Sequence, residues 1–233
     1  MERLDKLLAS TGMWTRREVK ELVRQGRVTV NGEVALRPER KYDPSDAVQV
    51  DGERVACGGF TYLMLHKPKG VLTATEDARQ TTVLDLLPPQ YRRAGLAPVG
   101  RLDKDTTGLL LLTDDGALAH RLLAPKSHVD KVYLARIDGT ADARDVRAFA
   151  EGMTLASGET CMSAVLEPMG EGACRVTLRE GKYHQVKRML AARGKPVLEL
   201  HRVSMGPLRL DPALGAGQWR PLTAEEVRAL GAG

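Results

Sequence analysis

Apolar positions over residues 1–55 follow a helical spacing first and a strand spacing afterwards. Leu4, Leu7 and Leu8 lie on one side of a short amphipathic helix, and Thr15 is placed to cap a second helix predicted over Arg16–Gln25. Short strands follow at Val28–Val30, from Glu33 and at Ala47–Val50, with turn signals at Asn31–Gly32 and Asp51–Gly52. We therefore expect a small unit at 1–55, a linker at 56–59 and a larger unit at 60–233.

Residues 60–233 mix strand and helix patterns without regular alternation between them. The predicted strands are Tyr62–His66, Gly108–Leu112, Lys131–Ile137, Cys161–Glu167, Ala173–Arg179 and Val197–Val203. The predicted helices are Val83–Leu87, Gly116–Leu123, Asp142–Glu151, Tyr183–Arg193 and Ala224–Leu230, the last with a capping box at Thr223 and Glu226. This order favours an α+β sheet over a doubly wound one.

The stretch Gly100–Gly116 combines a polar loop, an unbroken apolar strand and an acidic turn. Leu109–Leu112 is apolar without alternation, which is typical of a strand buried on both faces. Asp103 thus lies on a tight loop that a buried strand supports, where a carboxylate can meet a ligand. The alternative is a plain turn in which Asp103 and Asp105 hydrogen-bond to their own backbone.

Four carboxylates of this stretch could in principle hold a hard cation: Asp103, Asp105, Asp114 and Asp115. Two basic residues lie inside the cluster, and a strand of about five residues holds its two ends roughly 15 Å apart. We therefore expect no metal site. The chain also lacks Walker, G-x-G-x-x-G and G-x-S-x-G patterns, so we expect no nucleotide cofactor and no serine hydrolysis.

The chain carries a net charge of +5, a modest bias toward polyanionic partners, and this charge is uneven. Residues 175–202 hold eight Lys or Arg against two Glu. A solvated face is the ordinary explanation of such a run, but the histidines and the tyrosine within it favour a groove that faces phosphates. Free backbone amides at a helix start preceded by Gly181 would bind phosphate as well. The side chains near that start are Lys182, His184, Lys187 and Arg188.

A second basic feature lies on the predicted helix of the first unit. Arg17, Lys20, Arg24 and Arg27 follow one another at steps of three, four and three residues, which places them on one side of the helix. We interpret this basic stripe as a surface for a polyanion, with a merely solvated face as the alternative.

Cysteine usage and hydropathy indicate the compartment. Cys57, Cys161 and Cys174 form an odd set without a C-x-x-C pair, which argues against a disulfide framework or a zinc site and favours a reducing cytosol. The amino-terminal stretch does not suit a signal peptide, and no run approaches the ~18 apolar residues of a membrane span. We expect a soluble, cytoplasmic protein with no membrane partner.

Several groups of residues, in order along nearly the whole chain, resemble one family. Arg3–Lys6, the basic helix through Arg27 and Val28–Gly32 are similar to an S4 RNA-binding domain. Gly100–Gly108 (GRLDKDTTG) resembles the catalytic motif of ribosomal RNA pseudouridine synthases of the RsuA type. The other motifs of that family are matched by His66–Gly70, Lys131–Tyr133, Glu180–Met189 and Leu200–Gly206.

The resemblance implies an alpha-L-like S4 domain followed by an α+β pseudouridine synthase domain with a central, mainly antiparallel sheet. It implies that the chain converts uridine to pseudouridine in ribosomal RNA without a metal, nucleotide or organic cofactor. The length, the S4 domain and the D-T-T-G-L run favour 16S RNA, naked or in a small-subunit assembly intermediate. Large-subunit relatives that modify 23S RNA share this architecture. We expect a monomer.

The resemblance also implies roles for single residues. Asp103 would act on the ribose of a flipped-out uridine and would stay ionised beside a cation, by analogy Lys187, with Arg188 as the alternative. Tyr133 would stack on the base, and Arg101 would hold the opened backbone. The other RNA-binding candidates are Arg17, Lys20, Arg24, Arg27, Lys182, His184 and Arg188. Asp105, Asp114 and Asp115 would keep turn and capping roles.

Two functions of other classes stay open on the sequence. A noncatalytic RNA-binding or ribosome-assembly factor on the same fold would keep the basic stripe but would not need Asp103. A metal-dependent phosphodiesterase would use the aspartates, would lose its activity to chelators and would cut RNA rather than isomerise it.

Overall fold

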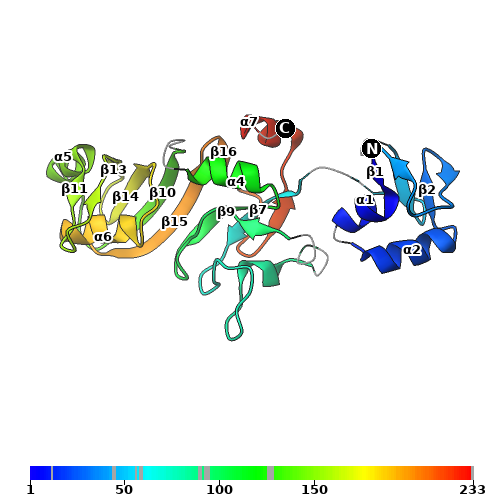
Figure 1. Cartoon of the computed structure of the whole chain (residues 1–233). Coiled ribbons are helices and arrows are strands. Elements are labelled where there is room, and N and C mark those ends of the chain that lie inside the picture. Colours follow the sequence, from blue (N-terminus) through cyan, green and yellow to red (C-terminus); the bar gives the residue numbers. More distant parts are fainter. Residues whose placement is uncertain are drawn as a thin grey trace. The chain divides into compact units, whose positions relative to one another are not determined.

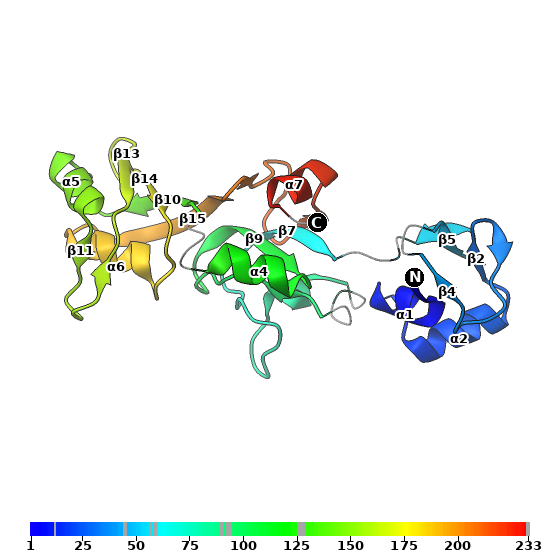
Figure 2. The same ribbon diagram turned by 45° about the horizontal axis from the view of Figure 1, so that its top comes forward.

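The computed structural model describes residues 1–11, 13–43, 46–55, 57, 60–88, 91, 95–124 and 129–231. The chain divides into two compact units, Met1–Thr61 with Leu87–Ala97 and Tyr62–Leu86 with Pro98–Gly233. Of the linker predicted over 56–59, only Cys57 belongs to the described residues. Figures 1 and 2 show both units from two directions.

The first unit joins two helices and a small sheet through one apolar core (Figure 1). The helices are α1 (Leu4–Ser10) and α2 (Arg16–Arg24). Among the described residues an antiparallel sheet has the order β3-β2-β5-β6, formed by β2 (Val28–Val30), β3 (Glu33–Val34), β5 (Val48–Val50) and β6 (Glu53–Val55). β1 (Glu2–Arg3) pairs separately with β4 (Lys41–Tyr42).

Local signals in the first unit act as the sequence predicts. The Thr15 hydroxyl accepts a hydrogen bond from the Glu18 N–H at 3.2 Å, and the Glu18 carboxylate accepts one from the Thr15 N–H at 2.6 Å. Such a cap contributes about 1 kcal/mol. Asn31 and Gly32 have φ of 53° and 85°, which is the backbone that a type I′ hairpin turn requires.

One prediction for this unit is wrong. Helix α2 ends at Arg24, so Arg27 does not lie on the helix with the other basic residues. The chain turns at Gly26, which has a φ of 69°, and Arg27 directly precedes β2. The basic residues keep their spacing of three and four beyond Arg24, although the helix ends there.

The second unit is built on a mainly antiparallel sheet, as the resemblance implied. Its main order among the described residues is β13-β14-β10-β15-β9-β7-β17, with β16 beside β15 and β8 beside β9. All its pairings that have a defined register are antiparallel except that of β9 with β15. The strands are β7 (Tyr62–Lys67), β8 (Ala97–Pro98), β9 (Thr107–Thr113), β10 (Lys131–Ile137), β13 (Val165–Pro168), β14 (Ala173–Leu178), β15 (Val197–Met205), β16 (Leu208–Arg209) and β17 (Trp219–Pro221).

Helices and a short hairpin accompany this sheet (Figure 2). They are the 3₁₀ turn Val83–Leu86, α4 (Gly116–Leu123), α5 (Ala143–Glu151), α6 (Gln185–Ala192), α7 (Ala224–Ala229) and the pair β11 (Met153–Thr154) and β12 (Thr160–Cys161). Asp115 caps α4, and Thr223 with Glu226 forms the predicted capping box of α7. The strand predicted over Cys161–Glu167 is wrong as one element, because β12 and β13 divide it. The predicted helix start at Tyr183 is also wrong, because His184 has the left-handed φ of 48° and α6 begins after it.

The parallel pairing of β9 with β15 forms where the two strands approach closely. Thr107 lies opposite His201 and Gly108 opposite Arg202. A Cβ on Gly108 would lie 2.2 Å from the Arg202 carbonyl oxygen, and Gly108 has a φ of 108°. Only glycine fits this position without a shift of the backbone. Leu109–Leu112, the continuation of this strand, is fully buried, as predicted.

We expect Gly108→Ala to lower the free energy of unfolding by about 3 kcal/mol, because the new methyl group overlaps the Arg202 backbone and φ becomes strained. Chemical denaturation measures the change. The matched control is Gly158→Ala, because Gly158 also has a positive φ (82°) but nothing lies within 4 Å of its Cβ position. The control should lose about 1 kcal/mol from backbone strain alone. Equal losses in the two variants would contradict the close approach of β9 and β15.

Candidate active site

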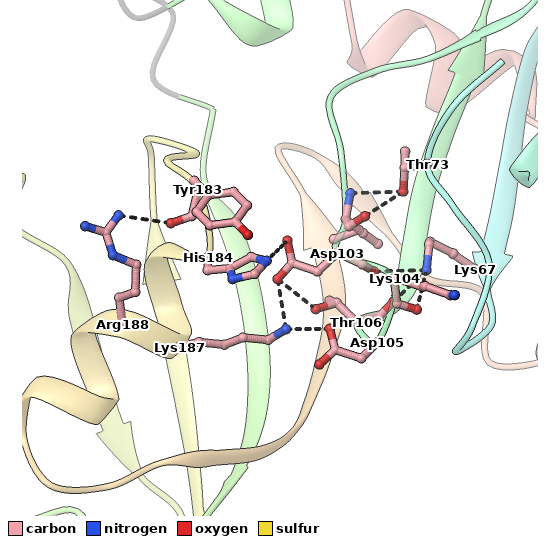
Figure 3. Close-up of polar contacts among 11 residues, drawn as sticks. Lys67, Thr73, Asp103, Lys104, Asp105, Thr106, Tyr183, His184, Lys187 and Arg188 are labelled. Atoms are coloured by element: carbon pink, nitrogen blue, oxygen red, sulfur yellow. Dashed lines mark hydrogen bonds and ion pairs between the residues drawn. The ribbon is translucent and has the colours of Figure 1, made fainter. Parts of the chain in front are cut away.

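The parallel pairing of β9 with β15 brings two loops of distant sequence together. The polar loop 101–106 leads into β9, and α6 leads into β15. Because the two strands run in the same direction, the segments that precede them meet at the same edge of the sheet. Asp103 on the loop therefore faces the side chains of α6 (Figure 3).

Lys187 of α6 is the cation that pairs with Asp103. Its Nζ lies 2.9 Å from Asp103 Oδ2 and 2.5 Å from Asp105 Oδ1, and the Asp103 side chain is 27% exposed. Partial burial lowers the pKa of Lys187, but the hydrogen bonds and charges of Asp105 and Asp103 outweigh it and raise the pKa above its usual value. Lys187 therefore stays charged and favours the ionised form of Asp105.

The expectation that Asp105 serves only in a turn is wrong. Its carboxylate is the second partner of Lys187, and the hydrogen bond from Lys187 holds the pKa of Asp105 below its usual range. Asp103 and Asp105 are two residues apart on a bent loop, which allows both to reach one ammonium group (Figure 3). The sequence contained no signal for this pairing, because the partners lie 82 residues apart.

Arg188 points to a different set of partners. Its Nη1 lies 2.6 Å from Glu159 Oε2 and donates to the Tyr183 carbonyl at 3.2 Å, and its Nη2 donates to Ser157 Oγ at 2.6 Å. Neighbouring residues on a helix point about 100° apart, so only one of Lys187 and Arg188 can face Asp103. The structure decides this alternative in favour of Lys187.

His184 is a second basic group beside Asp103. Its Nε2 lies 3.6 Å from Asp103 Oδ1, and its ring stacks on Tyr183 with the centroids 3.8 Å apart. Thr106 Oγ1 lies at the limit of a hydrogen bond to Asp103 Oδ2, at 3.5 Å. The carboxylate of Asp103 thus has a basic group near each oxygen.

A buried lysine holds the loop that carries Asp103, and sequence reasoning did not assign it a role. Lys67 ends β7 and is fully buried. Its Nζ lies within hydrogen-bond distance of four backbone carbonyls, which its three N–H groups share: those of Pro68 (3.1 Å), Asp103 (3.1 Å), Lys104 (3.4 Å) and Thr106 (3.0 Å). Burial lowers the pKa of Lys67 to about 8, although the charges of Asp103 and Asp105 oppose that shift. The sequence feature that could have pointed to this role of Lys67 is a charged residue directly after a mostly apolar predicted strand.

Tyr133 and Arg101 border the same cavity as Asp103. Tyr133 lies on β10 and is 8% exposed, whereas Arg101 is exposed. Thr73 on a neighbouring loop fixes the backbone between Arg101 and Asp103, because its hydroxyl donates to the Leu102 carbonyl at 2.7 Å. An aromatic ring, an exposed cation and the Asp103 carboxylate thus border one cavity.

The remaining basic candidates divide between the two units. Lys182 also borders the Asp103 cavity, but its Nζ pairs with Glu180 at 3.3 Å and its N–H donates to the Gln185 side chain at 3.0 Å. In the first unit, Arg17, Lys20 and Arg24 are exposed on α2, and Arg24 pairs with Glu21 at 2.5 Å. Arg27 is bound by Asp51 through two hydrogen bonds of 2.7 and 2.6 Å, which leaves it less available than predicted.

Among the described residues, no group of three or more His, Cys, Asp or Glu side chains is arranged to hold a metal ion. Within the same described part of the chain, no helix is both long and apolar enough to span a membrane. The three cysteines are free and buried.

Comparison with known proteins gives consistent matches. A family model described as RNA pseudouridylate synthase matches residues 61–192, and an S4 domain model matches residues 2–48. The chain is 47% identical to an uncharacterized RNA pseudouridine synthase, YtzG, of Bacillus subtilis, with 98% of each covered. It is 43% identical to the ribosomal small subunit pseudouridine synthase A of Pseudomonas aeruginosa, with 97% of this chain and 98% of the relative covered. A solved structure described as a pseudouridylate synthase matches with a TM-score of 0.69 and 37% identity, over 99% of this chain and 100% of that one.

We expect Lys67→Met to lower the free energy of unfolding by about 2 kcal/mol at pH 7. The loss arises because the buried carbonyls lose their donor. Removal of a buried charge offsets part of it. The loss should grow between pH 8 and 10. With its pKa lowered to about 8, Lys67 releases its proton in the folded protein well below its usual pKa of 10.5, which it keeps in the unfolded chain. Wild-type stability therefore gains relative to the variant as the pH rises.

Urea unfolding of both proteins from pH 7 to 10 measures this difference. Lys69→Met is the control, because Lys69 is exposed two residues further along the chain. If Lys67→Met lowered the free energy of unfolding by the same amount at every pH, the Lys67 ammonium would not be desolvated as described.

Proposed function

The chain belongs to the RNA pseudouridylate synthase family, and we propose that it converts one uridine of 16S ribosomal RNA to pseudouridine, with Asp103 as the catalytic carboxylate. The family and its relatives indicate pseudouridine synthase activity on RNA. The reaction breaks the C1′–N1 bond of uridine and forms a C1′–C5 bond between the same base and ribose. The observation that carries the residue assignment is the ion pair of Asp103 with Lys187 at the cavity that Tyr133 borders.

The surroundings of Asp103 suit a carboxylate that acts on a ribose. Lys187 Nζ lies 2.9 Å from one carboxylate oxygen of Asp103, and His184 Nε2 lies 3.6 Å from the other. Lys67 and Thr73 hold the backbone on both sides of it, so the carboxylate needs little reorganisation when a substrate enters. Asp105 shares the charge of Lys187, which keeps the ammonium in place.

The cavity beside Asp103 requires that the uridine leave its stack. A base inside a helix cannot reach this carboxylate, so the nucleotide must flip out. Tyr133 supplies the flat face on which the uracil would stack, and the exposed Arg101 at the same cavity would hold a phosphate of the opened backbone. Both roles are part of the proposal.

Support for 16S RNA comes from relatives. Proteins of Pseudomonas aeruginosa and Escherichia coli that are 43% and 40% identical to this chain bear the name ribosomal small subunit pseudouridine synthase A. The first unit would add affinity through Arg17, Lys20 and Arg24 on α2, and the RNA would be free or part of a small-subunit assembly intermediate in the cytoplasm. Three free, buried cysteines suit such a reducing compartment.

We expect that cells without this protein lack one pseudouridine of 16S RNA, that the wild-type chain restores it and that Asp103→Asn does not. The amide keeps the shape of the side chain but removes the charge that acts on the ribose. Purified Asp103→Asn should bind RNA within about threefold of wild type and lose at least roughly 10³-fold in rate. Pseudouridine mapping of 16S and 23S RNA, together with filter binding, measures these outcomes.

Asp105→Asn is the matched control, because Asp105 contacts the same ammonium without bordering the Tyr133 cavity. We expect it to lose less than about tenfold in rate. Modification by Asp103→Asn would contradict the catalytic assignment. A missing pseudouridine in 23S RNA instead of 16S RNA would contradict the substrate, and RNA cleavage would contradict the reaction.

We expect Arg17, Lys20 and Arg24 changed together to Ala to weaken RNA binding and to reduce the salt dependence of log Kd by about 2, because each lost contact to a single-stranded phosphate lowers the slope by about 0.7. Binding titrations at several salt concentrations measure this slope. Arg27→Ala is the control, since Asp51 already pairs with Arg27, and it should change the slope little. An unchanged slope in the triple variant would leave the stripe as solvated surface.

A further inference from the structure

A second pocket of the larger unit lies next to the Asp103 cavity, and three of the cations that line it, Lys131, Arg179 and Arg202, have no part in the proposed reaction. We name it the Lys131 pocket. It has a volume of about 410 Å³ and an apolar wall formed by Val99, Leu123, Tyr133 and Met162. Its cationic lining is formed by Arg101, Lys131, Arg179, Lys182 and Arg202.

Two of these cations are buried. Arg202 on β15 is 1% exposed, and its Nε donates to the Leu109 carbonyl at 2.8 Å. Its Nη2 is also buried and has no hydrogen-bond partner among the described residues. Lys131 at the start of β10 is 8% exposed and donates to the Arg179 carbonyl at 3.0 Å. A buried guanidinium nitrogen without an acceptor costs free energy, so this arrangement indicates a missing acceptor.

The register of the sheet explains why these cations share a pocket with Tyr133. Tyr133 lies opposite Arg202 in the antiparallel pairing of β10 with β15. Lys131 and Tyr133 are two residues apart on β10, so their side chains lie on the same face. Burial, followed by the positive charge of Arg202, lowers the pKa of Lys131, although the charge of Asp130 opposes this shift.

The nearby carboxylates do not balance this charge. Asp130 accepts a hydrogen bond from Arg179 Nε at 2.8 Å, at the surface. Glu180 borders the pocket, but it accepts from the Met162 N–H at 2.7 Å and pairs with Lys182 at 3.3 Å. Neither is in salt-bridge contact with Lys131 or Arg202 within the described part of the chain. The pocket therefore carries an excess of buried positive charge, which an anion would compensate.

We propose that the Lys131 pocket binds a phosphate group of the RNA, that of a nucleotide next to the target uridine. The pocket shares Arg101, Tyr133, Gly181 and Lys182 with the Asp103 cavity, so one strand can reach both. Lys131 and the Arg202 guanidinium line the pocket and supply the positive charge that the phosphate would compensate. The apolar wall leaves room for the nucleoside that carries the phosphate. This proposal rests on one part of the proposed function, namely that the neighbouring uridine enters the Asp103 cavity.

A charge-neutralisation scan tests the proposal in RNA that the full-length protein binds. Each linkage around the target uridine is replaced in turn by an uncharged methylphosphonate, and binding is measured for wild type and Lys131→Gln. We expect one linkage next to the uridine at which neutralisation weakens wild-type binding about tenfold but leaves Lys131→Gln unchanged. A charged hydrogen bond of about 1.5 kcal/mol or more corresponds to such a factor.

The controls separate this contact from general electrostatics and from misfolding. Arg147→Gln removes one exposed charge of α5 and should show the wild-type scan. Lys131→Arg keeps the charge and should retain the sensitive linkage, which a merely unfolded variant would not. Inorganic phosphate is the second probe, and it should raise the melting temperature of wild type and Arg147→Gln more than that of Lys131→Gln.

Identical scans for wild type and Lys131→Gln would overturn the proposal, as would sensitivity to an abasic nucleotide without sensitivity to the neutral linkage. Pseudouridine mapping of the same RNA keeps the two proposals distinguishable. A sensitive linkage in an RNA that is bound but not isomerised would support the phosphate pocket and contradict the proposed function. Isomerisation with no Lys131-dependent linkage would do the reverse.

Discussion

The close parallel contact between β9 and β15 is the constraint on which the candidate site depends. Gly108 lets the Arg202 backbone approach to a distance that no Cβ would permit, and Arg202 Nε then donates to the Leu109 carbonyl. This contact joins the β7–β9 pair to the β10–β14 part of the sheet. It also aligns the loop before β9 with α6 before β15, so Asp103 and Lys187 meet without being neighbours in sequence.

Four cations lie around this contact, and they differ in their burial and in the groups that they bind. Lys67, fully buried, binds only backbone carbonyls and fixes the loop, while Lys187, partly exposed, binds the two loop carboxylates. Arg202 and Lys131 are also buried, on the face that Tyr133 shares, and have no carboxylate in salt-bridge contact among the described residues. Lys67 and Lys187 therefore find their hydrogen-bond and ion-pair partners within the protein. Arg202 and Lys131 lack such an ion-pair partner in the same part of the chain, so their positive charge is available to an anionic ligand such as a phosphate of RNA.

Local features of the sequence were predictive where the interaction itself is local. The helix cap at Thr15 and the hairpin turn at Asn31–Gly32 involve residues within three positions of each other, and both are present in the structure. The buried strand Leu109–Leu112 follows from an unbroken apolar run. Arg27 shows the limit of this reasoning, because a periodic pattern does not reveal that the helix has already ended and that Asp51 offers a partner.

The sequence by itself determined the α+β class, most element positions and the loop that presents Asp103, since hydrophobic periodicity, caps and turns act over a few residues. Only the tertiary structure decided that Lys187 rather than Arg188 faces Asp103, that Asp105 joins this pair and that Lys67 holds the loop. These contacts link segments tens of residues apart. They depend on strand register and on the direction in which a helix presents each side chain, which no local pattern encodes.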